Sequence, residues 1–269
     1  MSGTGNKLNI LWLWPDILCQ HGDRGNVMAL ARVSGLYGIE TEITRVSRLN
    51  DDFDLEGADI VMLGPGELVV MPEISSALAR RSDELKAYVE SGGVLFAAGT
   101  TGAALGVRTR RLDGTLINGA GLLGIECRER ETVLGDDLIF LPAKNPLPGK
   151  AETADTAAAV LPVYGIQIHM MDIDLAAGQE PFGHTVYGYG NNGSGAEGAV
   201  SGGVIFTNAL GPVLVKNPWL TIDVINLALY RQREAAGGEM IQFDPGLFEL
   251  ELASAEAIKL FNEKKEKPK

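Results

Sequence analysis

Residues 96–106 have the sequence of a strand, a sharp turn and a helix start: Phe-Ala-Ala-Gly-Thr-Thr-Gly-Ala-Ala-Leu-Gly. In enzymes that carry a nucleophile on such a turn, the attacking side chain is exposed on strained backbone and the helix start can stabilise an oxyanion. Gly99 occupies the nucleophile's position here. Glycine adopts positive φ freely but has no sulfur or oxygen atom that could attack a carbonyl. We therefore expect the backbone of a catalytic turn without its chemistry.

Two hydroxyl groups follow this glycine, on Thr100 and Thr101. A threonine nucleophile needs an adjacent base, and hydroxyls at a helix start are more often caps, so we interpret both as structural. One alternative is that either hydroxyl replaces the missing nucleophile. Another is that the helix start at Gly102 offers amide hydrogens to an anionic small molecule.

The chain contains three histidines, His21, His169 and His184. His169 and His184 fall in two predicted strands, and either could be proposed as a replacement general base. A strand histidine is more often hydrogen-bonded structure than a catalyst, and no nucleophile is evident for it to serve. His21 precedes a polar loop.

That loop contains Asp23, Arg24 and Asn26. Asp23 and Asn26 are residue types that cap helices, and Arg24 could pair with a carboxylate, so a rigid loop and a ligand or partner contact remain alternatives. Asn191 and Asn192 open a glycine-rich turn by composition alone.

The two cysteines, Cys19 and Cys127, lie far apart in the sequence. Their separation matches neither a metal-binding spacing nor a disulfide framework, so we expect reduced structural thiols and no metal site. No cofactor is expected.

Composition indicates a globular protein without a membrane span. A chain of 269 residues with 45% hydrophobic residues can bury a sizeable core. The sequence contains no apolar run of about 18 residues and no signal-peptide pattern, so we expect a cytoplasmic protein. A net charge of −12 disfavours nucleic acid and anionic membranes as partners. The basic residues 264–267 are interpreted as a frayed tail.

The first hundred residues alternate between strand and helix patterns. Strands are predicted over Leu8–Leu13, Thr41–Val46, Ala58–Leu63 and Val94–Ala98, and helices from about Asn26 to Gly35–Gly38 and over Ile74–Glu90. This alternation predicts an α/β fold with a parallel sheet covered on both faces. The turn at Gly99 then lies at the carboxyl end of a strand, where ligands bind in such sheets.

Beyond about residue 110, short strands and glycine-rich turns predict an antiparallel extension. Its strands are predicted over Leu116–Cys127, Leu134–Phe140, Gly165–Asp174 and Gly183–Tyr189, with a surface excursion over Leu141–Pro162, a further strand over Val204–Phe206 and a helix over Pro218–Arg233. We expect one domain over residues 7–235. Residues 236–269 are expected to form a partly flexible appendage with one short helix around Ala255–Phe261.

Four motifs carry a family resemblance. They are Trp14-Pro15-Asp16 with residues 22–26 (Gly-Asp-Arg-Gly-Asn); Gly64-Pro65-Gly66-Glu67; residues 187–192 (Tyr-Gly-Tyr-Gly-Asn-Asn) with Glu197-Gly198; and residues 211–218 (Gly-Pro-Val-Leu-Val-Lys-Asn-Pro). Over roughly residues 8–230 the chain resembles the cobyric-acid-synthase-like (CobB/CobQ-like) class I glutamine amidotransferases, and among them the amidotransferase subunits of lipid II isoglutaminyl synthases. The resemblance implies a flavodoxin-like fold and a heterodimer with a Mur-ligase-like partner in cell-wall biosynthesis. It also makes Glu67 and His169 pocket candidates, together with the residues after Gly99, and the loop residues named above partner candidates.

The same resemblance implies that the catalytic residues are missing. Setting the family's last turn glycine on Gly106 places its catalytic cysteine on Gly99, and its histidine, directly before Gly-Pro, falls on Leu210. A looser alignment places Thr132 at the basic glutamine-recognising position. Thiolate attack and imidazole acid–base catalysis are both needed for glutamine hydrolysis. We therefore expect a degenerate subunit; an active amidotransferase with displaced groups, using a threonine or a cysteine from elsewhere, and a small-molecule binding module remain alternatives.

Overall fold

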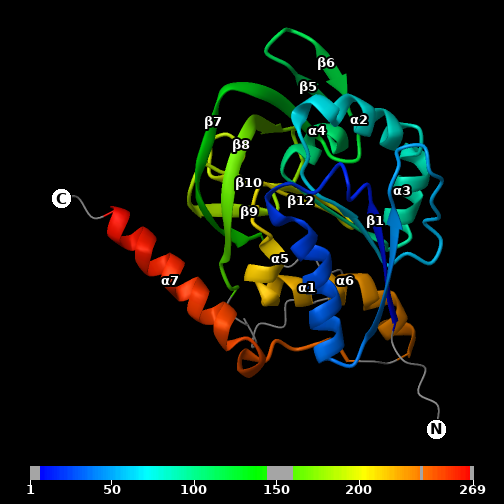
Figure 1. Ribbon diagram of the computed structural model, residues 1–269, viewed down its shortest axis with the longest axis vertical. Helices are drawn as coiled ribbons and strands as arrows, with labels where there is room; N and C mark the ends of the chain where they lie inside the picture. Colours follow the sequence, from blue (N-terminus) through cyan, green and yellow to red (C-terminus); the bar gives the residue numbers. More distant parts are fainter. Residues whose placement is uncertain (1–6, 144–159, 237–238, 267–269) are drawn as a thin grey trace.

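A central six-stranded sheet organises the protein, whose computed structural model describes residues 7–143, 160–236 and 239–266 (Figure 1). The strand order is β11-β12-β4-β3-β1-β2, and all neighbours are parallel except the edge strand β11. These strands span Lys7–Leu13 (β1), Glu40–Val46 (β2), Ile60–Leu63 (β3), Val94–Ala98 (β4), Ala199–Ser201 (β11) and Val204–Thr207 (β12). The order β2-β1-β3-β4-β12 is that of flavodoxin-like folds, which confirms the predicted fold class.

Helices cover both faces of this sheet, so its strands are buried on both sides. Leu8, Ile10 and Trp12 of β1 belong to one hydrophobic core, which also contains residues of α1 (Arg24–Leu36) and α6 (Pro218–Ala236). The alternate residues Leu11 and Leu13 belong to a second core, beneath α2 (Met71–Ala79), α3 (Ser82–Glu90) and α4 (Gly102–Leu105). The alternation of side chains along each strand thus separates the two cores.

The helix predicted over Ile74–Glu90 is in fact two helices, α2 and α3. Arg81 separates them, because its backbone (φ −119°, ψ 19°) is not helical; its side chain donates to the carbonyl of Phe53 at 2.6 Å and lies over the Phe53 ring at 3.9 Å. Ser82, followed by acidic residues in the first turn, begins the second helix. That start signal interrupts a helical periodicity that otherwise appears continuous.

The antiparallel strands form a second sheet instead of widening the first. Its order is β10-β9-β7-β5-β6, with β8 also paired to β7, and its strands span Arg108–Arg110 (β5), Leu116–Asn118 (β6), Ile125–Pro142 (β7), Val163–Leu175 (β8), Gly183–Tyr187 (β9) and Ala196–Glu197 (β10). The single strand predicted over Leu116–Cys127 is wrong: β6 ends at Asn118 and β7 begins at Ile125. Between them the chain passes close to Gly106, at the end of α4. A methyl group at Gly119 would lie only 2.1 Å from the carbonyl oxygen of Gly106, so a larger residue does not fit at this position. Most of the predicted excursion, residues 144–159, lies outside the described residues.

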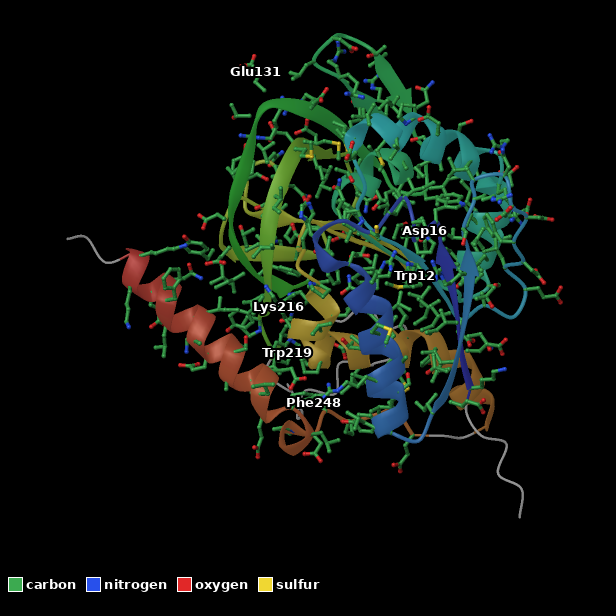
Figure 2. The ribbon with its side chains drawn as sticks, viewed as in Figure 1. Trp12, Asp16, Glu131, Lys216, Trp219 and Phe248 are labelled. Atoms are coloured by element: carbon green, nitrogen blue, oxygen red, sulfur yellow. The ribbon has the colours of Figure 1, made fainter. Side chains whose placement is uncertain are left out.

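The C-terminal helix is longer than predicted. Helix α7 spans Glu249–Glu266, not Ala255–Phe261, and follows a short turn that Asp244 caps by accepting from the amide of Gly246 at 2.9 Å. Phe248, directly before the helix, is fully buried and stacks on Phe243, whose ring meets Trp219 of α6 edge-on. Figure 2 labels Phe248 and Trp219 near the start of α7.

The far end of α7 is also anchored. Lys265 donates to Asp136 and Asp137 of β7 at 3.2 and 3.4 Å. The interpretation of residues 264–267 as a frayed tail is therefore wrong for residues 264–266, and residue 267 lies outside the described residues. The division into a domain over residues 7–235 and a partly flexible appendage stays a prediction.

Candidate functional site

The carboxyl ends of β1, β3, β4 and β12 meet on one edge of the central sheet, at the position where flavodoxin-like folds bind ligands. Four segments follow these strands: residues 14–23, Gly64–Glu67, Gly99–Gly102 and residues 208–212. The first two are joined by a hydrogen bond from the amide of Gln20 to the carbonyl of Pro65 at 3.1 Å. These segments form the candidate site.

Gly99 and Leu210 are in contact at this edge. Gly99 has φ +65°, the left-handed conformation that glycine adopts without strain. A methyl group at Gly99 would lie 3.0 Å from Cβ of Pro65 and 3.1 Å from Cδ2 of Leu210. The two positions that the resemblance assigned to nucleophile and base thus face each other, and the space between them is lined by carbon atoms.

Hydrogen bonds fix the two threonine hydroxyls beside Gly99. Thr100 Oγ1 donates to the carbonyl of Gly66 at 2.6 Å and accepts from the amide of the same residue at 3.0 Å. Thr101 Oγ1 donates to the carbonyl of Ala98 at 2.8 Å. Both hydroxyl protons go to backbone carbonyls and not to a base, which disfavours either residue as a nucleophile.

Two backbone amides at the turn, those of Gly102 and Gly66, are engaged as well. The amide of Gly102 donates to the carbonyl of Gly99 within a 3₁₀ turn over Gly99–Thr101, and α4 has only four residues. An oxyanion hole needs backbone N–H groups that point at free space. The Gly66 amide, which borders the turn, instead donates to Thr100. The amides of Gly102 and Gly66 are therefore not free to bind an anion.

His169 is buried and serves the structure. Its Nε2 lies 3.0 Å from the carbonyl of Asn191 and its Nδ1 lies 3.0 Å from Nε2 of Gln167. The carbonyl can only accept, so the neutral ring donates through Nε2 and accepts at Nδ1. Burial lowers the pKa of His169 to about 4. His21 and His184 are exposed.

The polar loop between β1 and α1 is held by internal contacts. Asp23 stands at the helix start, but its carboxylate accepts from Nδ2 of Asn26 at 2.7 Å instead of capping the backbone. Oδ1 of Asn26 accepts from the amide of Leu214, near the start of α5 (Val213–Lys216), at 2.8 Å. Arg24 is exposed and lies 3.5 Å from Asp16. Asn26 thus caps a different helix from the one that contains it.

Glu197 is a buried carboxylate whose role in the site region the sequence did not reveal. It accepts from Oγ1 of Thr207 at 2.6 Å and from the amide and Nδ2 of Asn208 at 2.8 Å each. Burial raises its pKa, while these hydrogen bonds act in the opposite direction. Asn191 joins the same network, because its Oδ1 accepts from Nδ2 of Asn208 at 2.8 Å. Glu197-Gly198 belongs to one of the motifs that carry the family resemblance, but the motif does not indicate that this carboxylate is buried.

The remaining polar candidates are less buried than this network. Glu67 and Thr132 are exposed, and Asn192 donates to Asp174 at 2.9 Å. Cys127 is buried, which raises its pKa to about 12, whereas Cys19 is partly exposed in the segment that follows β1. Cys19 is therefore the more accessible thiol.

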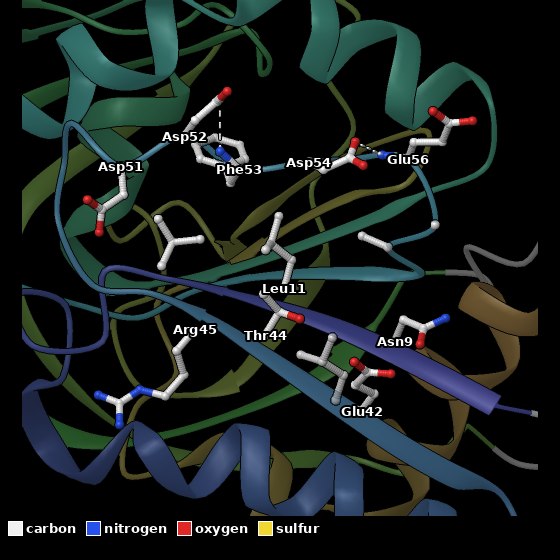
Figure 3. Close-up of a pocket in the computed structure, with 14 residues that line it drawn as sticks. Asn9, Leu11, Glu42, Thr44, Arg45, Asp51, Asp52, Phe53, Asp54 and Glu56 are labelled. Atoms are coloured by element: carbon white, nitrogen blue, oxygen red, sulfur yellow. Dashed lines mark hydrogen bonds between the residues drawn. The ribbon is translucent and has the colours of Figure 1, made fainter.

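Two cavities lie next to the segment 48–58, and the smaller one, of about 410 Å³, also borders the candidate site through Trp14. One of about 500 Å³ lies beside the edge strand β2 (Figure 3) and is lined by Asn9, Ile10, Leu11, Glu42, Thr44, Arg45, Val46, Asp51, Asp52, Phe53, Asp54, Glu56, Gly57 and Ala58. Arg45 is drawn to Asp16 at 3.1 Å, so carboxylates dominate the lining. Among residues 7–143, 160–236 and 239–266, no three His, Cys, Asp or Glu side chains gather closely enough to hold a metal ion. Across these same ranges no helix has the length and apolar character needed to cross a membrane.

No protein-family model matches the chain. The chain is 28% identical over 233 residues to the GatD subunit of lipid II isoglutaminyl synthase (glutamine-hydrolyzing) from Streptococcus pneumoniae (strain ATCC BAA-255 / R6), covering 84% of this chain and 82% of that protein.

Two solved structures share the fold. A crystal structure of a glutamine amidotransferase superposes with a TM-score of 0.50 at 18% identity, covering 81% of this chain and 98% of the other. The structure of PurLQS from Thermotoga maritima gives 0.52 at 13% identity, covering 85% and 100%. The chain is therefore glutamine-amidotransferase-like in sequence and has the class I glutamine amidotransferase fold.

The contact between Gly99 and Leu210 predicts a steric cost for any side chain at residue 99. Gly121 has the same φ, +66°, but open space around it, so it is a matched control for backbone strain. We expect Gly99→Ala to lower the free energy of unfolding by about 1–2 kcal/mol more than Gly121→Ala, because a methyl group there crowds Leu210 and Pro65. Urea denaturation measures both. Equal losses would mean that the space beside Gly99 is not filled.

Proposed function

We propose that this protein is a catalytically degenerate glutamine-amidotransferase-like subunit that binds and supports a Mur-ligase-like partner acting on a cell-wall-type precursor. The observation that carries the proposal is the contact between Gly99 and Leu210, where glutamine hydrolysis would need a thiolate next to an imidazole. A hydrogen atom and an isobutyl group cannot form a thioester or transfer a proton.

Two further contacts support the loss of the reaction. The amide of Gly66, which would be a candidate donor to an oxyanion, already donates to the hydroxyl of Thr100. His169 is engaged at both ring nitrogens and its lowered pKa makes it a poor base at neutral pH. The site thus has neither nucleophile nor base at the two expected positions, and its Gly66 amide is already engaged.

The proposed partner follows from the similar protein of Streptococcus pneumoniae, whose name describes a subunit of lipid II isoglutaminyl synthase. A subunit that retains fold and surface can stabilise a ligase or set its orientation without supplying ammonia. We propose that this occurs in the cytoplasm, and that the ligase takes free ammonia or another amine as its nitrogen source.

Glutamine hydrolysis tests the proposal directly. We expect the purified chain, alone and mixed with a candidate Mur-ligase-like partner, to release ammonia from glutamine only at the rate of a protein-free control. A hydrolysing relative assayed in parallel is the positive control. In the mixed sample, product formation should proceed with ammonium chloride alone. A pair that strictly requires glutamine would overturn the proposal.

An active amidotransferase with a displaced nucleophile is the second candidate function. Cys19 is a better candidate for that nucleophile than Thr100 or Thr101, because its thiol is partly exposed. Cys19 precedes Gln20, whose amide bonds to Pro65, and Pro65 borders Gly99. A glutamine-analogue electrophile such as a chloroketone would label Cys19 if this thiol had taken over. Loss of label in Cys19→Ser, together with glutamine hydrolysis by the unchanged chain, would support this candidate.

A further inference from the structure

Helix α7 has two opposite apolar faces, of which only one is covered. Its inner face packs on the domain through Phe248, Leu252, Ala255 and Ile258. The opposite face consists of exposed residues at helical spacing: Leu250, Ala253, Ala257, Leu260 and Phe261. Leu250 is 80% exposed and Phe261 56%. We call these five residues the outer stripe.

The anchoring contacts of α7 hold the outer stripe away from the domain. Glu251 accepts from Arg32 of α1 at 3.0 Å near one end, and Lys265 reaches β7 at the other. The helix therefore cannot roll to bury its outer stripe, and Figure 1 shows it along the side of the molecule, with its C-terminal end away from the central sheet. A second apolar face at the spacing of a helix–helix contact is otherwise costly to expose.

The sequence of the outer stripe is nearly symmetric about its centre. Large residues lie toward both ends, at Leu250 and at Leu260 with Phe261, and the small residues Ala253 and Ala257 lie between them. When two such helices cross antiparallel, the large residues of one meet those of the other, while the alanines let the backbones approach. A two-fold contact requires this kind of self-complementary surface.

The charges at the two ends of the outer stripe have opposite signs. Glu249 is exposed at the start of the outer stripe and Lys264 at its end. In an antiparallel pair that matches Ala253 with Ala257, Glu249 of each helix lies about one turn from Lys264 of the other, within reach of the long lysine side chain, whereas a parallel pair would place like charges together. We propose that the outer stripe of α7 is a homodimerisation surface on which a second copy of this chain packs antiparallel.

The size of the surface sets the expected affinity. Helix α7 has 18 residues and is about 27 Å long, so a single helix pair falls at the low end of specific interfaces, below about 1,200 Å² of buried area. A dissociation constant on the order of 10–100 µM is expected. Sedimentation equilibrium or light scattering of the full chain up to about 300 µM covers this range.

Substitutions on the exposed face test the proposal without touching the core. We expect Leu260→Glu to weaken dimerisation at least tenfold, while circular dichroism and the unfolding midpoint stay those of the unchanged chain. The control Lys259→Glu changes an exposed residue outside the stripe and should leave the dimer intact. A chain that is monomeric at 300 µM, or a dimer that Leu260→Glu does not weaken, would overturn the proposal.

A charge exchange tests the antiparallel arrangement specifically. Glu249→Lys and Lys264→Glu should each weaken the dimer about tenfold, and the double variant should recover the original affinity, because the ion pairs are then re-formed with opposite sign. Failure of the double variant to recover would refute antiparallel self-pairing. If instead Leu260→Glu abolished binding of the Mur-ligase-like partner to a monomeric chain, the outer stripe would be a partner surface and the proposal would be wrong.

Discussion

Replacing Glu197 with alanine should lower the free energy of unfolding by about 3–5 kcal/mol. Its carboxylate is fully buried and accepts three hydrogen bonds, from Oγ1 of Thr207 and from the amide and Nδ2 of Asn208. Truncation leaves these donors without their acceptor in a site that water does not reach. A buried donor without an acceptor lowers stability by more than one hydrogen bond normally contributes to it. Urea denaturation at pH 7 measures the effect.

Glu197→Gln separates charge from shape. One amide oxygen can still accept from Thr207 and from the Asn208 backbone, but the new NH₂ group faces Nδ2 of Asn208, which also donates to Asn191. We therefore expect a smaller loss of about 1–2 kcal/mol. The exposed Glu73→Ala in α2 is the control and should stay within about 0.5 kcal/mol of the unchanged chain. A similarly small effect of Glu197→Ala would mean that the network does not stabilise the fold.

Asp23 should make the protein less stable as pH rises from about 4 to 7. Burial raises the pKa of Asp23 from 3.8 to about 7, opposed only in part by the hydrogen bond from Asn26. Between these two values the folded state binds a proton that the unfolded state has released, so unfolding becomes easier with increasing pH. A difference of about three pKa units corresponds to on the order of 4 kcal/mol, lost across this window and constant above it.

Asp23→Asn isolates this contribution. An amide oxygen can keep the contact with Asn26 and carries no charge to bury, so the variant should gain stability relative to the unchanged chain as pH rises from 4 to 8, by on the order of 4 kcal/mol over the window. Comparing the two chains at each pH cancels other titrating groups, such as His169. Asp83→Asn, at an exposed residue of α3, should show no such trend. A pH-independent difference for Asp23→Asn would show that the carboxylate is not buried in the folded state.

The central sheet was predictable because its strands are short apolar runs separated by helical patterns and glycine turns. The second sheet was less so. The register of its long strand β7 with β8 shifts between Glu129 and Leu134. The alternation of apolar and polar residues that would identify one continuous strand is therefore interrupted. The length of helix α7 was underestimated because apolar residues lie on two opposite faces, so the sequence does not show the single apolar stripe by which a helix is recognised.

The candidate site shows the same limit. Motif spacing placed Gly99 and Leu210, and the fold brings them into contact. The bonds of Thr100 to Gly66 and of Asn26 to Leu214 link residues far apart in the sequence, and such pairs follow only from the packed loops. Glu197 was missed for a related reason, since its donors come from another strand.

The bond between Thr100 and Gly66 has a consequence for the history of the protein. On the proposed function, glutamine hydrolysis would need a cysteine at residue 99 and a histidine at residue 210, and the Thr100 hydroxyl would still accept from the amide of Gly66. Neither substitution alone supplies both a nucleophile and a base, so neither alone would be favoured by selection for turnover. A chain with the present residues would therefore stay in its present role, because the first of the required mutations brings no advantage.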